Sequence, residues 1–170
     1  MESLLSNEMK SKQIYSKITV SFKGRNKIKP TDVWYPDFSR KDIKDMSRMF
    51  DNEDLNGIDL SYWDTSRVTN MNYMFIKAKN IPESIGNWNT NNVTDMSYMF
   101  YKAQNIPESI GNWNTKNVTD MSNMFYKAQN IPESIGSWNT SNVKDMSHML
   151  SITQNIPESI GNWNTSNVTN

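Results

Sequence analysis

The sequence predicts an α/β repeat solenoid, a curved stack of 25-residue coils in which each coil buries its apolar face against its neighbours. Three observations indicate this class. Tryptophan recurs at a fixed period, a Met-x-x-Met segment ending in Phe or Leu recurs at the same period, and the units after Trp88 are close copies of one another. The tryptophans are Trp63, Trp88, Trp113, Trp138 and Trp163, and the methionine segments are 46–50, 71–75, 96–100, 121–125 and 146–150.

The chain divides into an N-terminal arm with a β-strand cap, residues 1–37, and the repeat domain, residues 38–170. Residues 14–22 alternate between apolar and polar side chains, which is typical of a half-buried strand. A non-repeat segment ahead of the first coil would cover its exposed apolar end. Phe38 stands one full period before Trp63, so the repeat begins there.

Within one coil, the apolar residues predict short strands and one helix. Val93, Met96, Phe100 and Ala103 follow helical spacing, which predicts a helix over 95–104. The segments 110–113 and 117–119 are predicted as short strands around an Asn-Thr turn. Because packed helices need more room than paired strands, the stack should curve with its strands on the inside.

Side chains at equivalent positions should meet from coil to coil. The tryptophans share the phase of buried positions, so we interpret them as core and not as sugar-stacking platforms. Polar rows should satisfy the turns between coils. These rows begin at Asn89 and Thr90 and have one member in each later coil.

Residues 63–75 carry the pattern Trp-[Asn/Asp]-Thr-x-x-Val-x-[Asn/Asp]-Met-x-x-Met-Phe, which returns through the repeat domain. This pattern resembles the BspA-type surface-protein repeat, known from mycoplasmas as a 25-residue repeat domain of unknown function and found also in large DNA viruses. The resemblance covers roughly residues 38–170. It implies a leucine-rich-repeat-like solenoid, often a bacterial surface adhesin or antigen, and it brings no catalytic residues.

The residues available for chemistry do not predict an enzyme. The chain has no cysteine and one histidine, His148, so thiolate sites and zinc sites are not expected. His148 occupies a variable, exposed position that does not suit a general base. Glutamate recurs once per coil from Glu83 to Glu158, too few oxygens for a calcium site. We therefore expect no cofactor and no metal.

Lysine and arginine balance aspartate and glutamate at 18 each, but residues 1–30 are basic and the remainder is acidic. The basic segment is either a solubilising cap or a patch for an acidic partner. An acidic repeat region argues against nucleic acid. No apolar run of membrane-spanning length is present, so membrane insertion is not expected. The N-terminus lacks the layout of a secretory signal, which favours a cytoplasmic or virion-associated location over secretion.

The sequence predicts a non-enzymatic repeat scaffold for protein–protein interaction or structural assembly. The alternative is an adhesin that binds carbohydrate or a host surface through exposed aromatic residues. The last coil either closes the stack or self-associates. Exposed side chains outside the core pattern form the expected interaction surface: Asn91, Tyr98, Tyr101, Lys102, Lys116, Tyr126, Lys127 and His148.

Overall fold

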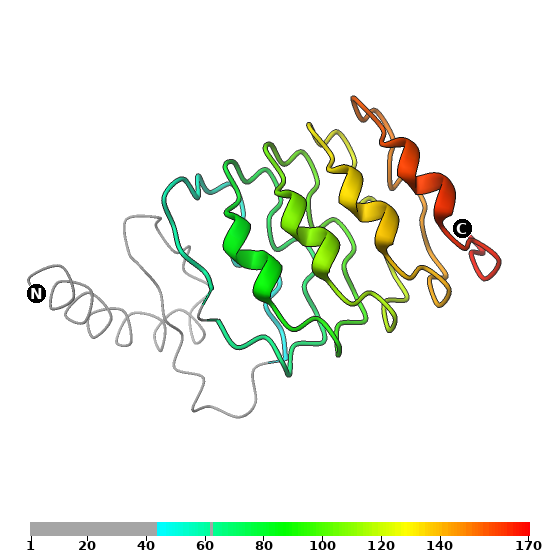
Figure 1. The fold of residues 1–170 in the computed structure, drawn as a ribbon, viewed down its shortest axis with the longest axis horizontal. Coiled ribbons are helices and arrows are strands. Elements are labelled where there is room, and N and C mark those ends of the chain that lie inside the picture. The colour runs from blue at the N-terminus through cyan, green and yellow to red at the C-terminus, as the bar shows by residue number, and fades with distance from the viewer. Residues whose placement is uncertain (1–43, 62) are drawn as a thin grey trace, which may run out of the picture.

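The computed structural model describes residues 44–61 and 63–170. These residues divide into five units of equal length, and successive units lie side by side along one axis (Figure 1). An isolated parallel bridge joins the first residues of neighbouring units, which are Asp45, Asn70, Asp95, Asp120 and Asp145. The predicted N-terminal arm and β cap, residues 1–37, lie outside the described residues.

Each of the last four units contains one short 3₁₀-helix, and these helices follow one another along one side of the row (Figure 1). A proline with extended backbone precedes each helix; Pro107 has φ −75° and ψ 149°. Proline suits this place because it fixes φ and has no N–H to satisfy. The N–H of Trp113 closes the turn by donating to the Ile110 carbonyl at 3.1 Å. The helices are η1 (Glu83–Asn87), η2 (Glu108–Asn112), η3 (Glu133–Ser137) and η4 (Glu158–Asn162).

The helix predicted at 95–104 is absent, and this prediction was wrong. Tyr98, Lys102 and Asn105 adopt left-handed backbone conformations, with φ of 56°, 57° and 53°. A right-handed helix cannot contain such residues. The segment consists instead of consecutive turns whose apolar residues all face the core. Each turn returns an apolar residue to the core after three or four residues. A helix has the same spacing, so the sequence pattern predicted a helix where consecutive turns occur.

The strands predicted at 110–113 and 117–119 are also absent. Residues 110–112 lie in η2, and in the described part of the chain parallel pairing is limited to isolated bridges. The expected curvature was derived from α-helices packed against strands. That derivation therefore does not apply to these units.

Backbone hydrogen bonds alternate between the unit itself and its neighbour. The Tyr98 N–H donates to the Ser122 carbonyl of the next unit at 2.9 Å, whereas the Met99 N–H donates to Met96 of its own unit at 3.3 Å. The Phe100 N–H again crosses to the next unit. Every second residue of this stretch thus holds two units together, and the intervening residues close the turns.

Aromatic side chains fill the core by stacking on their equivalents in adjacent units. The rings of Phe75 and Phe100 lie 5.5 Å apart, and those of Trp88 and Trp113 lie 6.4 Å apart and almost parallel. The Trp113 indole N–H donates to the buried Ile85 carbonyl at 2.9 Å. The interpretation of the tryptophans as core is confirmed for those that are 3–4% exposed, namely Trp63, Trp88, Trp113 and Trp138.

The threonine row joins the units through side-chain hydrogen bonds. Thr115 is 1% exposed, and its Oγ1 donates to the Asn139 carbonyl of the next unit at 3.1 Å. Asn114 bonds both within its unit and beyond it: its Oδ1 accepts the Lys116 N–H at 3.1 Å in its own turn, and its amide donates to the Asn91 Oδ1 of the preceding unit at 2.7 Å. The predicted polar connection between units is therefore confirmed for the threonines, and Asn114 also makes one while it completes its own turn. Thr65, Thr90 and Thr140 repeat the contact of Thr115.

A glutamate, a serine and a glycine make a second connection between units. The Glu108 carboxylate accepts the Ser134 N–H at 3.1 Å, and the Glu108 carbonyl accepts the Ser134 hydroxyl at 2.6 Å. A Cβ added at Gly111 would lie 2.5 Å from the Ser134 Cβ. The glutamate row is therefore structural, and the glycine is required by close packing between units.

We expect Gly111→Ala to lower the free energy of unfolding by about 1–3 kcal/mol, because the new methyl group overlaps Ser134 of the next unit. Gly161→Ala is the matched control, since no atom lies within 4 Å of its added Cβ. Urea unfolding of both variants measures the difference. Equal stability of the two variants would contradict this account of the packing.

We expect Thr115→Val to lower the free energy of unfolding by about 1–3 kcal/mol, because it leaves the Asn139 carbonyl without its donor at nearly unchanged shape. Thr165→Val is the control, since Thr165 occupies the equivalent position in the last unit and is exposed. Thermal unfolding followed by tryptophan fluorescence compares the two. A loss at Thr165 as large as at Thr115 would show that the effect does not come from the bond between units.

Candidate interaction surface

Four tyrosines from three adjacent units form a continuous array that we call the tyrosine stripe. The rings of Tyr73 and Tyr98 stack at 4.5 Å, and those of Tyr101 and Tyr126 stack at 4.9 Å. Tyr98 and Tyr101 join the two pairs with their centroids 5.8 Å apart. All four side chains are half-buried. The stripe is therefore one connected surface, not a set of separate aromatic residues.

Backbone conformation directs the first pair outward. Tyr73 and Tyr98 have φ of 57° and 56°, in the left-handed region. This conformation costs roughly 1–2 kcal/mol per non-glycine residue and needs support from its surroundings. Two contacts supply this support at Tyr98. Met99 and Phe100, which follow it, are buried in the core, and the Tyr98 N–H donates a hydrogen bond to the next unit.

Positive side chains lie against the stripe. The Arg48 guanidinium carbon is 4.1 Å from the Tyr73 ring centroid. The Lys102 Nζ lies 5.2 Å from the Tyr101 ring, and the Lys127 Nζ lies 5.5 Å from the Tyr126 ring. These distances fit cation–π contacts. Burial, followed by Tyr98, raises the pKa of Tyr73, with Arg48 acting in the opposite direction.

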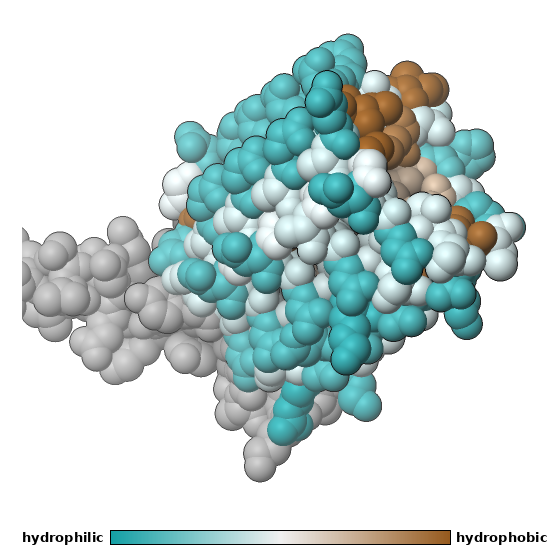
Figure 2. Space-filling view, turned by 45° about the vertical axis from the view of Figure 1, so that its right-hand side comes forward, coloured by the Kyte–Doolittle hydropathy of each residue, from teal (hydrophilic) through white to brown (hydrophobic). Residues whose placement is uncertain are grey.

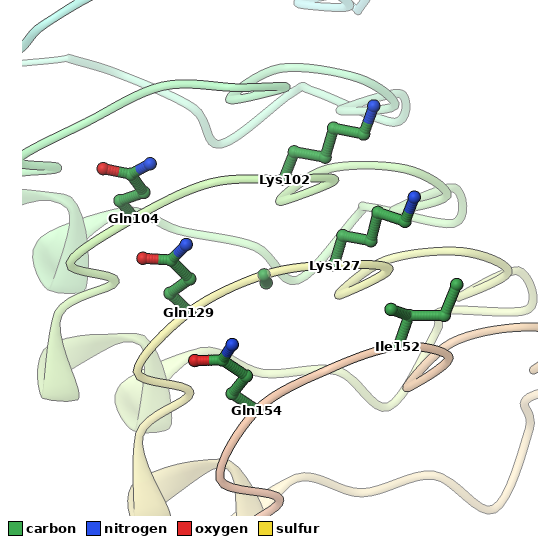
Figure 3. A pocket seen from close by; sticks show the side chains of 7 residues that line it. Lys102, Gln104, Lys127, Gln129, Ile152 and Gln154 are labelled. Atoms are coloured by element: carbon green, nitrogen blue, oxygen red, sulfur yellow. The ribbon is translucent and has the colours of Figure 1, made fainter.

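A groove with a volume of about 380 Å³ runs beside the stripe. Its lining forms two columns along the stack (Figure 3). One column contains Lys102, Lys127 and Ile152, and the other contains Gln104, Gln129 and Gln154. Each column has one member per unit, so the groove follows the stacking direction.

The charge of this surface is positive. The segments 98–105, 123–130 and 148–155, which line the groove and carry most of the stripe, contain no aspartate or glutamate. Nearby acidic groups are engaged in turns: the Asp95 Oδ1 accepts the Ser97 N–H at 2.9 Å. The surface thus differs in sign from the described repeat units as a whole, which carry more acidic than basic residues.

The structure brings together five of the eight predicted surface residues, Tyr98, Tyr101, Lys102, Tyr126 and Lys127. His148 occupies the row of Tyr98 in the last unit and lies 3.4 Å from the Ser151 hydroxyl.

The other two predicted residues belong to a different turn, between the tryptophan and the bridge. There Asn91 accepts a hydrogen bond from Asn114 at 2.7 Å, and Lys116 follows one unit later in the same row.

Sequence reasoning missed Arg48, Tyr73 and the glutamine column. Their spacing contained the necessary signal, because Arg48 and Tyr73 share the row of Tyr98, and Gln104 and Gln129 are one repeat apart. The expected helix already placed Tyr98, Tyr101 and Lys102 on one outer face, at positions i, i+3 and i+4. The contact of Tyr98 with Tyr73 and the glutamine column beside the lysines depend on the path of the turns.

The described residues give little support for other kinds of site. Within residues 44–61 and 63–170, no three acidic or histidine side chains gather in an arrangement that could hold a metal ion. The helices in the same ranges are all too short or too polar to cross a membrane.

Apolar side chains are exposed at the last unit. Figure 2 shows an apolar area toward this end of the stack, on a surface that is otherwise mostly hydrophilic. The large exposed apolar residues among those described are Ile152, at 68%, and Ile156, at 50%. Ile152 also lines the groove, so the lysine column ends in an apolar side chain.

The stacked units and their repeating contacts define a tandem-repeat protein. Residues 16–112 and 103–170 match the family described as Mycoplasma protein of unknown function, DUF285. These matches cover most of the sequence, so the chain belongs to this family. The resemblance to the mycoplasma-type repeat is thereby confirmed, and the likeness to BspA-type surface proteins stays a prediction. Neither curated proteins nor solved structures gave a match.

We expect Ile152→Asn to raise the free energy of unfolding by about 1 kcal/mol, because Ile152 is β-branched and has φ 57°, whereas asparagine tolerates this conformation. Ile156→Asn is the control: it replaces an exposed isoleucine that is not left-handed. Urea midpoints at an unchanged slope measure both effects. An equal change in both variants would show that backbone strain is not the cause.

Proposed function

We propose that this chain is a non-enzymatic, leucine-rich-repeat-like scaffold that binds a protein partner through the tyrosine stripe and the adjoining groove. One observation carries the proposal: four stacked, half-exposed tyrosines lie together, and three of them, with two lysines, belong to segments 98–105 and 123–130, which contain no aspartate or glutamate. Tyrosine and arginine are enriched among residues that dominate binding energy at protein interfaces.

The rigidity of the stripe supports this proposal. Each ring contacts at least one other ring, as Tyr98 does with Tyr73 and Tyr101. Side chains held in place before binding lose less conformational entropy when a partner arrives. The core below them is built from stacked phenylalanines, which fixes the positions of the units. The units therefore act as a support that keeps several contact groups in register.

The stacking also favours a protein over a carbohydrate. A sugar ring stacks on an open aromatic face, but Tyr73 and Tyr98 cover one face of each other, as do Tyr101 and Tyr126. Lysine ammonium groups lie against Tyr101 and Tyr126 as well. The stripe therefore offers mainly ring edges and hydroxyl groups, which suit polar and charged peptide groups better than a pyranose face.

The test is partner capture from the cells that produce this protein, with identification by mass spectrometry. We expect a partner whose recovery falls about tenfold or more in Tyr101→Ala/Tyr126→Ala, as for an interface hot spot. Asn91→Ala/Lys116→Ala, in the separate turn, is the control and should retain it. If the captured partner is a second copy of this chain, the scaffold builds an assembly.

Two results would overturn the proposal. One is capture that is equal for the tyrosine variant and the wild type. The other is binding on a glycan array that disappears in Tyr101→Ala/Tyr126→Ala, which would establish the adhesin alternative. Circular dichroism and thermal unfolding of both variants show whether the fold is retained.

A further inference from the structure

We propose that the groove binds an extended peptide segment with two carboxylate side chains and an adjacent apolar side chain. The carboxylates pair with Lys102 and Lys127, and the apolar side chain contacts Ile152. This inference rests on the proposed function and names the chemistry of the partner.

The order of side chains along the groove carries the inference. One column presents two ammonium groups and then the side chain of Ile152, which is 68% exposed (Figure 3). A ligand that follows the column therefore meets positive charge in two consecutive units and apolar surface in the third. The glutamine column on the other side offers amide donors and acceptors to the backbone of an extended chain.

The spacing of the column suits an extended peptide. Equivalent rings in adjacent units lie between 4.5 Å and 6.4 Å apart, and those of Tyr101 and Tyr126, next to the lysines, lie 4.9 Å apart. Side chains on one side of an extended peptide are roughly 6.6 Å apart, twice the rise per residue. Lysine has a flexible four-carbon stem, so two ammonium groups can spread by this small difference. Alternate residues of the peptide would then meet successive units.

The tyrosine stripe increases the preference for anions. Stacked rings present their edges, and the edge is the positive part of the aromatic quadrupole. The phenol hydroxyls add hydrogen-bond donors beside Lys102 and Lys127. No aspartate or glutamate occurs in the segments that line the groove, so no carboxylate of these segments competes with a ligand for the two lysines.

The same features favour a peptide over a long polyanion. Nucleic acid binding depends on several phosphate contacts, commonly about 6–10, and the groove presents two lysines. A long polyanion would also pass acidic parts of the surrounding units, where acidic residues outnumber basic ones. A short segment confined to the groove avoids that repulsion.

The experiment measures fluorescence anisotropy of labelled synthetic peptides with the full chain at low salt. The probe is Glu-Ser-Glu-Ser-Leu, tested together with its reversed sequence. The controls are Gln-Ser-Gln-Ser-Leu, which lacks the carboxylates, and Glu-Ser-Glu-Ser-Asn, which lacks the apolar side chain. We expect one of the two acidic–apolar peptides to bind, and each control peptide to bind about fivefold more weakly or less.

Charge reversal identifies the site. Lys102→Glu/Lys127→Glu should weaken the peptide about tenfold or more, since attraction becomes repulsion. Lys116→Glu/Lys144→Glu makes the same change in net charge at exposed lysines outside the groove, and should weaken it less than about threefold. Ile152→Asn should weaken binding about fivefold although it stabilises the fold, so that loss cannot be attributed to unfolding.

Equal losses in the two charge-reversed variants would overturn the inference, because binding would then follow net charge alone. Tighter binding of single-stranded DNA or of an acidic polysaccharide in the same assay would overturn it also. If neither peptide binds while capture of the partner still depends on Tyr101 and Tyr126, this inference fails and the proposed function stands. If that capture is absent as well, both fail.

Discussion

The structure depends on backbone hydrogen bonds that cross from one unit to the next at every second residue of the turn segment. Met96, Tyr98, Phe100 and Lys102 each donate to the following unit. Such bonds require that the units be in register, because a shift by one residue would direct turn-closing N–H groups to the neighbour. The constant length of the units follows from this requirement. Insertions within a unit would break the bonds on both sides of it.

Register then determines which side chains meet. Equivalent residues lie directly over one another, so phenylalanine stacks on phenylalanine and tryptophan on tryptophan. This arrangement requires residues with a left-handed backbone, which is unfavourable for side chains other than glycine. Each sharp turn needs one such residue, and Tyr98, Lys102 and Asn105 all belong to one unit. Hydrogen bonds and packing from the units on both sides stabilise these turns. In this architecture the supporting contacts of any one turn come mostly from other repeats.

The period, the tryptophan core and the threonine row could be predicted from the sequence, because each depends only on equivalence between units. The helix at 95–104 could not be excluded, because turns that return to the core every three or four residues produce the same apolar spacing as a helix. The left-handed conformation of Asn105 could be predicted, because asparagine tolerates it, whereas tyrosine and lysine at such positions gave no signal in the sequence. Tyr98, Tyr101 and Lys102 were predicted to share one exposed surface, but their joining with Tyr73 into one stripe depends on the path of the turns.

The rows that contribute the stripe differ from the structural rows in one respect. The row of the buried threonines keeps one residue type through all five units, as does the tryptophan row. The row of Tyr98 contains arginine, tyrosine, asparagine and histidine, and that of Tyr101 contains aspartate, isoleucine, tyrosine and serine. The register constrains these rows less, since most of their side chains lie at the surface, with Ile76 as a buried exception. Because the units differ in these two rows, the ring contacts pass from the row of Tyr98 to the row of Tyr101 along the stack. A surface of copied units thereby acquires a defined position and direction, which a partner needs in order to bind one place and not every unit alike.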